Sequence, residues 1–210
     1  MCIVTFKATV VAAPIPPFVG FEVGIHVEAD GLTFGIKSTT FAAGCSEHEI
    51  DWGDGTKETT SQSLNIAHAY ESPSDYRIRI SDTCTALSLC STTDASKVRS
   101  VVCTAKNLIT IATGSFSSCA NMTKADFRHS AVETISRMAF AGCSGLSGEL
   151  YLPKVVTLTY FSGKPPFSGC SGGIVKFHFG KANEEAIKAS DSYKADPTLG
   201  TSTAECVFDL

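Results

Sequence analysis

The sequence predicts a mainly β fold, with an antiparallel sandwich first and a short repeat array second. Its 210 residues include 46 Ser and Thr but only 11 Leu, a mixture that suits strands and turns better than helical bundles. In the first half, apolar and polar residues alternate in several runs, which is the period of a half-buried strand. In the second half, a Phe-x-x-Cys block recurs at intervals of 24 and 27 residues.

The charge and the residue pattern both change near residues 82–98, where a segment rich in Ser, Thr and Cys separates the two halves, and we place a domain boundary there. Residues 1–97 carry 6 basic and 12 acidic side chains, whereas residues 98–210 carry 11 basic and 9 acidic ones. We therefore expect one domain over residues 1–97 and a second over residues 98–210. The net charge of −4 argues against a nucleic-acid-binding surface.

Three alternating runs define the expected strands of the first domain: Phe21–Val27, Leu32–Ile36 and Tyr76–Ile80. Turn-forming residues separate these runs, at Ala29–Gly31 and at Glu71–Asp75. Several short strands joined by such turns are typical of a β-sandwich.

A tight turn is predicted at Ile50–Thr56, because Gly supplies positive φ and Asp side chains bond nearby backbone amides. The residues assigned to this structural turn are Asp51, Trp52, Gly53, Asp54 and Gly55. The alternative is a catalytic carboxylate pair, which would need an acid and a base flanking a substrate, or a Ca²⁺ loop, which would need more oxygen ligands, and neither pattern is present. We therefore expect a structural role, with Trp52 packed over the core.

The turn, His68-Ala-Tyr70 and the Tyr76–Ile80 run together resemble the polycystic kidney disease (PKD) family of immunoglobulin-like domains. The family pattern is a Trp/Phe-Gly-Asp-Gly turn, a His-x-Tyr motif and a strand that begins with Tyr. Asp75 departs from it, because the family usually has Gly there. The resemblance covers about residues 20–82 and implies a β-sandwich that serves as a spacer or binding module.

The repeat of the second half is carried by three blocks, Ser115–Met122, Ala139–Leu146 and Pro166–Gly173. An insertion at Gly163–Pro166 accounts for the longer second interval. The predicted repeat core is Phe116, Cys119, Phe140, Cys143, Phe167 and Cys170. Each unit is too small to bury its apolar side alone, so we expect these side chains to stack from unit to unit.

The middle block, Val132–Leu146, resembles the treponeme-type (BspA-like) leucine-rich repeat almost position by position. The resemblance covers about residues 98–180 and implies a short solenoid of stacked units. At its C-terminal end we expect a short helix at Asn183–Ser190 and a last strand or capping segment at Glu205–Asp209.

Solenoids present extended strand faces to protein ligands, which suggests where a ligand would bind. The candidate ligand face comprises Lys124, Arg128, His129, Tyr151, Lys176 and His178, with the acidic neighbours Asp126 and Glu149. The two resemblances together imply a non-catalytic binding or adhesion protein at the cell surface or outside the cell, as in gut bacteria. The alternative is a structural component of a phage tail or surface appendage, located in the phage particle. A glycan ligand is a further alternative.

No motif in the sequence indicates catalysis, a metal site or a cofactor, and no apolar segment is long enough for a membrane helix. An N-terminal signal peptide is not recognisable either, because prolines interrupt the apolar run at residues 8–19. We therefore expect neither enzymatic activity nor a bound cofactor.

The disulfide state of six cysteines stays open: Cys2, Cys45, Cys84, Cys90, Cys103 and Cys206. Cys84 and Cys90 are close enough in sequence for a local bridge, and Cys84 with Cys45 is a second pairing. The third alternative is free thiols throughout. The sequence contains no Cys-x-x-Cys motif, so we expect neither a zinc site nor a thioredoxin-like site.

Overall fold

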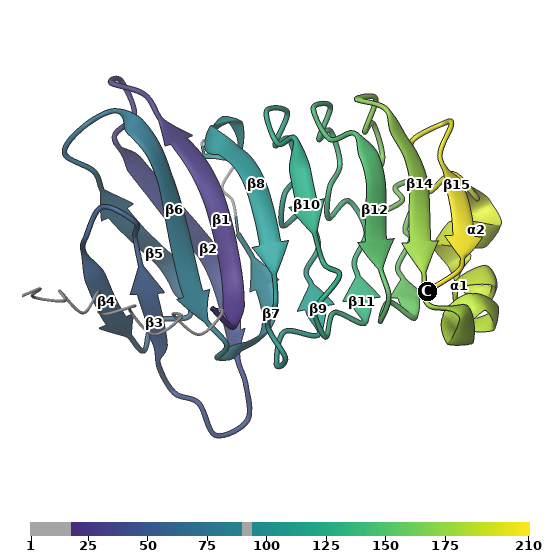
Figure 1. The fold of residues 1–210 in the computed structure, drawn as a ribbon, viewed down its shortest axis with the longest axis horizontal. Helices are drawn as coiled ribbons and strands as arrows, with labels where there is room; N and C mark the ends of the chain where they lie inside the picture. The colour runs from purple at the N-terminus through teal and green to yellow at the C-terminus, as the bar shows by residue number, and fades with distance from the viewer. Residues whose placement is uncertain (1–17, 90–93) are drawn as a thin grey trace, which may run out of the picture.

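The computed structural model describes residues 18–89 and 94–210, and the fold is mainly β. Two six-stranded sheets run along the molecule, and a three-stranded sheet adjoins them near the C-terminus. In Figure 1 the nearer layer of strands forms a continuous row from β4 at one end to β15 and the two α-helices at the other, and β5, β2, β7, β9 and β11 lie in a second layer.

Antiparallel pairing dominates the first half of the chain. Strand β1 (Gly20–Val27) pairs with β6 (Ser74–Ser81), which pairs in turn with β3 (His48–Asp51), and β3 pairs with β4 (Lys57–Thr60). In the opposite sheet, β2 (Thr33–Phe41) pairs with β5 (Leu64–Ala69) and with β7 (Cys84–Ser88). The three alternating runs of the sequence lie in β1, β2 and β6, with their apolar residues turned inward.

The expected boundary segment is not a plain linker, because it contains β7 and the start of β8 (Val98–Cys103). Leu87 and Leu89 are fully buried, and this burial explains why a segment rich in Ser and Thr forms a core strand. Strand β8 pairs with β1 on one side and with β10 (Lys124–Asp126) on the other, while β7 pairs with β9 (Thr110–Ile111). Both sheets therefore continue across the boundary.

In the second half, the strands pair in parallel. Strands β9, β11 (Thr134–Ile135) and β13 (Thr157–Leu158) extend one large sheet. On the other side, β10 is followed by β12 (Gly148–Leu152), which pairs with β14 (Ile174–Phe179), and β14 pairs with β15 (Glu205–Phe208). Figure 1 shows β8, β10, β12, β14 and β15 side by side, each with the same direction as its neighbour.

Stacked aromatic rings form the centre of the second half. The rings of Phe116 and Phe140 lie 5.0 Å apart, and those of Phe140 and Phe167 lie 5.1 Å apart and nearly parallel. Phe21 of β1 stacks on Phe116 at 6.0 Å, which continues the series into the first half. The buried apolar side chains consequently form one cluster that reaches from Phe21 to Ala204.

The C-terminal segment covers the far end of the stack. It contains α1 (Glu184–Ala189), α2 (Asp191–Ala195) and β15, so the helix and the last strand expected from the sequence are both present. Ile187 and Leu199 are fully buried there, and Phe208 stacks on Phe179 at 5.7 Å. The last apolar surface of the repeats is thereby shielded from water.

Candidate functional site

The predicted turn at Asp51–Gly55 is held by local hydrogen bonds. Asp51 Oδ1 accepts from the Gly53 amide at 3.0 Å, and Asp54 Oδ1 accepts from the Thr56 amide at 2.9 Å. Gly53 and Gly55 have φ of +85° and +96°, which side chains rarely adopt. Both carboxylates thus face the backbone of their own turn.

Asp54 also anchors the turn to the sheet behind it. Its Oδ2 lies 2.7 Å from His68 Nε2, and the His68 ring stacks on Trp52 at 5.0 Å. Partial burial opposes ionisation of Asp54, but the hydrogen bonds from Thr56 and His68 lower its pKa to about 2. The Asp54 carboxylate therefore serves a structural contact with His68.

The cysteines of the repeat blocks are buried thiols. Cys143 Sγ donates to the Phe116 carbonyl and Cys170 Sγ to the Phe140 carbonyl, both at 3.0 Å. Hydrogen bonding between neighbouring thiols raises the pKa of Cys143 and of Cys170, which disfavours the thiolate that a nucleophile needs. Cys119, at the same repeat phase, is also fully buried.

The remaining described cysteines, Cys45, Cys84, Cys103 and Cys206, are free thiols in the structure, so the Cys45–Cys84 bridge is not formed. Burial raises the pKa of Cys84, Cys103 and Cys206 to about 12. Cys2 and Cys90 lie outside the described residues, and with Cys90 lies the local Cys84–Cys90 bridge. In residues 18–89 and 94–210, no group of three or more His, Cys, Asp or Glu side chains is arranged to hold a metal ion.

The candidate ligand face lies on the outer side of β10, β12 and β14, where three of its members contact one another. The Arg128 guanidinium lies over the Tyr151 ring, with 5.4 Å from Cζ to the ring centroid. The Tyr151 ring stacks on the His178 ring at 4.5 Å, with the two planes within 6° of parallel. Arg128, Tyr151 and His178, which we call the Arg–Tyr–His stack, lie in three successive layers beside β10, β12 and β14.

Acidic residues hold each layer of the Arg–Tyr–His stack in place. Arg128 Nε and Nη2 donate to Asp126 at 3.0 and 2.5 Å, and this hydrogen bonding lowers the pKa of Asp126. The Tyr151 hydroxyl donates to Glu149 at 2.8 Å, which lowers the pKa of Glu149 and raises that of Tyr151. The layers are thus oriented before any ligand arrives.

His178 is not the exposed contact residue that the sequence suggested. Its side chain is buried, because the Tyr151 ring covers it and Asp209 accepts from Nδ1 at 2.9 Å. Nε2 lies 3.3 Å from Glu149 Oε2 but without hydrogen-bond geometry. His178 is therefore a support beneath Tyr151, and Arg128 and Tyr151 form the accessible layers.

The other predicted members of the ligand face lie around this stack. Lys124 is exposed two residues before Asp126 on β10, and His129 is exposed in the turn that follows Arg128. Lys176 is half-buried on β14, in register between Glu149 and Glu205 on the neighbouring strands. Sequence reasoning missed Asp209, because only the pairing of β14 with β15 brings it to His178.

Comparison with protein-family models, with curated proteins and with solved structures returned no match. Among the residues that the structure describes, no helix combines the length and the hydropathy that crossing a membrane requires.

Proposed function

We propose that this chain is a non-catalytic binding or adhesion module that contacts a protein ligand through the outer face of β10, β12 and β14. The Arg–Tyr–His stack is the observation that carries the proposal. Arg and Tyr are enriched in the centres of protein interfaces, where they supply much of the binding energy. A pre-oriented Arg128 and Tyr151 lose little conformational entropy when a partner covers them.

We further propose that residues 1–97 belong to a PKD-like immunoglobulin sandwich and residues 98–210 to a BspA-like leucine-rich-repeat array. The antiparallel pairing of β1 with β6 and of β2 with β5 supports the first assignment. The parallel strands and the stacked rings of Phe116, Phe140 and Phe167 support the second. Proteins with this combination act at the cell surface or outside the cell, which is the location proposed here.

Binding to an array of purified secreted and cell-surface proteins tests this function. The test variant is Arg128→Ala combined with Tyr151→Ala. The matched control is Arg137→Ala combined with Phe161→Ala, because Arg137 lies over the Phe161 ring at 4.9 Å in the same kind of pair elsewhere on the surface. We expect the test variant to weaken binding at least tenfold, while the control binds within twofold of the unchanged protein.

Two results would contradict the proposal: no binding to any protein of the array, or equal losses in the test and control variants. Sedimentation velocity separates ligand binding from the structural alternative. If the unchanged chain self-associates and the Arg128→Ala, Tyr151→Ala variant does not, the face serves assembly of a phage tail or surface appendage instead.

A further inference from the structure

The two nitrogens of the His178 ring differ in their partners. The two oxygens of Asp209 lie 2.9 and 3.0 Å from Nδ1, and an ionised carboxylate only accepts, so Nδ1 carries a proton. In a neutral ring, a proton on Nδ1 leaves Nε2 as an acceptor without hydrogen. Nε2 is buried and forms no hydrogen bond with any residue that the structure describes.

The group that faces Nε2 is another acceptor. Glu149 Oε2 lies 3.3 Å from Nε2, and the hydrogen bond from Tyr151 lowers the pKa of Glu149, so this carboxylate is an anion at neutral pH. Two acceptors at this distance repel each other, and a buried acceptor that lacks a donor costs free energy. A second proton on the ring reverses both effects, because Nε2 then carries a hydrogen and the ring is a cation between two carboxylates.

The same oxygen of Glu149 also holds Tyr151. The Tyr151 hydroxyl donates to Oε2 at 2.8 Å, so a movement of Oε2 removes the acceptor of this hydroxyl. The Glu149 side chain is 40% exposed and has room to turn towards solvent. His178, in contrast, is held by Asp209 and by the Tyr151 ring at 4.5 Å. Loss of the second ring proton therefore displaces Glu149, and Tyr151 loses its hydrogen bond.

The other charged groups around His178 largely balance one another. The titratable and charged side chains nearest to it are Arg128 beside β10, Glu149 and Tyr151 on β12, Lys176 on β14, Glu205 on β15 and Asp209 after β15. The charge of Lys176 opposes a second proton on the ring, but Lys176 is in register with Glu149 on one side and Glu205 on the other. The two carboxylates at the ring nitrogens therefore dominate the surroundings of His178.

We propose that His178 is a proton-dependent latch of the Arg–Tyr–His stack. The doubly protonated ring joins Asp209 to Glu149, which keeps Tyr151 oriented for binding, and loss of one proton releases Tyr151. This inference rests on the proposed function, since the face that the latch regulates is the one assigned to a protein ligand. Histidine is the side chain that ordinarily changes its charge between about pH 5 and 8. The ligand therefore binds more tightly in mildly acidic solution, where Tyr151 is held, than in mildly alkaline solution.

Nuclear magnetic resonance of the full chain, with ¹³C in its tyrosine and histidine rings, tests the latch without a ligand. The ¹³Cζ shift of Tyr151 responds to hydrogen bonding of the hydroxyl, so it should change with pH and share its midpoint with the ¹³Cε1 shift of His178. Glu149→Gln keeps an acceptor for the hydroxyl but removes the charge, so His178 should still titrate while the Tyr151 shift stays constant. Tyr151→Phe and His178→Gln identify the two signals.

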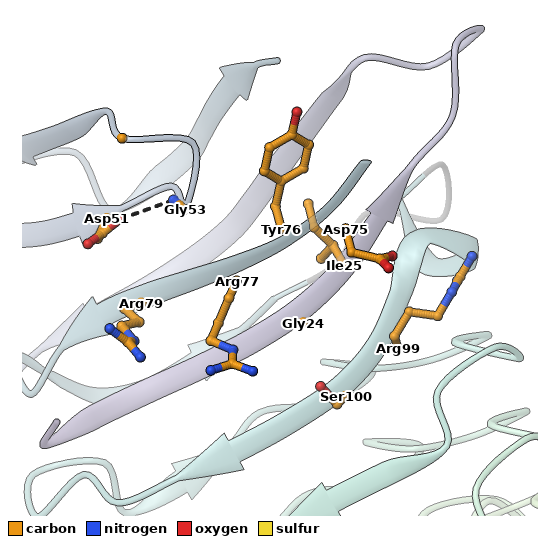
Figure 2. A pocket seen from close by; sticks show the side chains of 11 residues that line it. Gly24, Ile25, Asp51, Gly53, Asp75, Tyr76, Arg77, Arg79, Arg99 and Ser100 are labelled. Carbon is orange, nitrogen blue, oxygen red and sulfur yellow. Dashed lines mark hydrogen bonds between the residues drawn. The ribbon is translucent and has the colours of Figure 1, made fainter. Parts of the chain in front are cut away.

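His26 provides the matched control, because it also lies between two carboxylates. Its Nδ1 is 2.7 Å from Asp75 and its Nε2 is 3.2 Å from Glu28, but it belongs to β1, in the first half of the chain. Figure 2 shows Asp75 among the residues that line a hollow of about 880 Å³ on the outer side of β1, β6 and β8. His26→Gln should leave the pH dependence of the Tyr151 shift unchanged.

Three results would overturn the latch: a Tyr151 shift that is constant between about pH 5 and 8, a pH dependence that persists in Glu149→Gln, or one that is lost in His26→Gln. Affinity for a protein of the array that binds this face measures the functional consequence. We expect about threefold tighter binding at about pH 6 than at about pH 8 in the unchanged chain, and equal binding in Glu149→Gln. Equal affinity at both pH values in the unchanged chain would also overturn the latch, while the proposed function would stand. Coupled titration of His178 and Tyr151 without binding to any array protein would support the latch and refute the proposed function.

Discussion

Replacing Phe140 by Ala tests the packing of the repeat blocks most directly. The Phe140 side chain has no exposed surface, and its ring lies between those of Phe116 and Phe167 at 5.0 and 5.1 Å. The Phe127 ring meets it edge-on at 6.0 Å. A buried Phe→Ala change costs about 3–5 kcal/mol, and each aromatic pair contributes about 0.5–1.5 kcal/mol beyond burial. We therefore expect a loss near the upper end, about 4–5 kcal/mol.

Equilibrium unfolding in urea, followed by circular dichroism, measures this loss as a lower midpoint. Phe161→Ala is the matched control, because the Phe161 side chain is 63% exposed and contacts Arg137 at the surface. Its expected cost is below about 1 kcal/mol. A Phe140→Ala cost below about 1 kcal/mol, indistinguishable from that of the control, would refute the stacked core.

Two further predictions concern the Asp51–Gly55 turn. Gly53→Ala should destabilise the protein by about 2–4 kcal/mol in thermal or urea unfolding, because φ is +85° and the new Cβ would lie 2.6 Å from the Arg77 carbonyl oxygen. Gly55→Ala, with open space around the new Cβ, should cost only about 1 kcal/mol, and equal costs for the two variants would contradict this account. Asp54 has a pKa of about 2 against an ordinary value of 3.8, so the hydrogen bonds that its carboxylate accepts stabilise the fold above about pH 4, and this stabilisation is lost as the pH falls towards 2. Asp54→Asn should therefore flatten the decline in stability over that range, and an unchanged pH profile would show that Asp54 does not contribute.

The elements that the sequence predicted well are those whose signal is local. The alternation in Phe21–Val27 and Tyr76–Ile80 marks strands because neighbouring positions face opposite sides of one sheet. The turn at Asp51–Gly55 is likewise local, since its carboxylates bond amides two residues away. Each of these interactions can be recognised within a few residues of sequence.

Pairings between distant segments could not be predicted in the same way. His178 looks like an outward strand residue, and its burial depends on Tyr151 and Asp209, which are 27 and 31 residues away. The irregular register of β8 opposite Gly24 and Ile25 exists only because β8 pairs with β1. A single sequence carries no local signal for either arrangement.

The pairing of β8 on both of its edges determines how the protein could become longer. It is paired with β1 in one direction and with β10 in the other, so the sheet of the first half acts as a template for the strands that follow. Each additional unit would add one strand, or about 4.8 Å, to the row without altering the start or the C-terminal end. The number of such units would thus set the distance between β1 and the C-terminal helices α1 and α2.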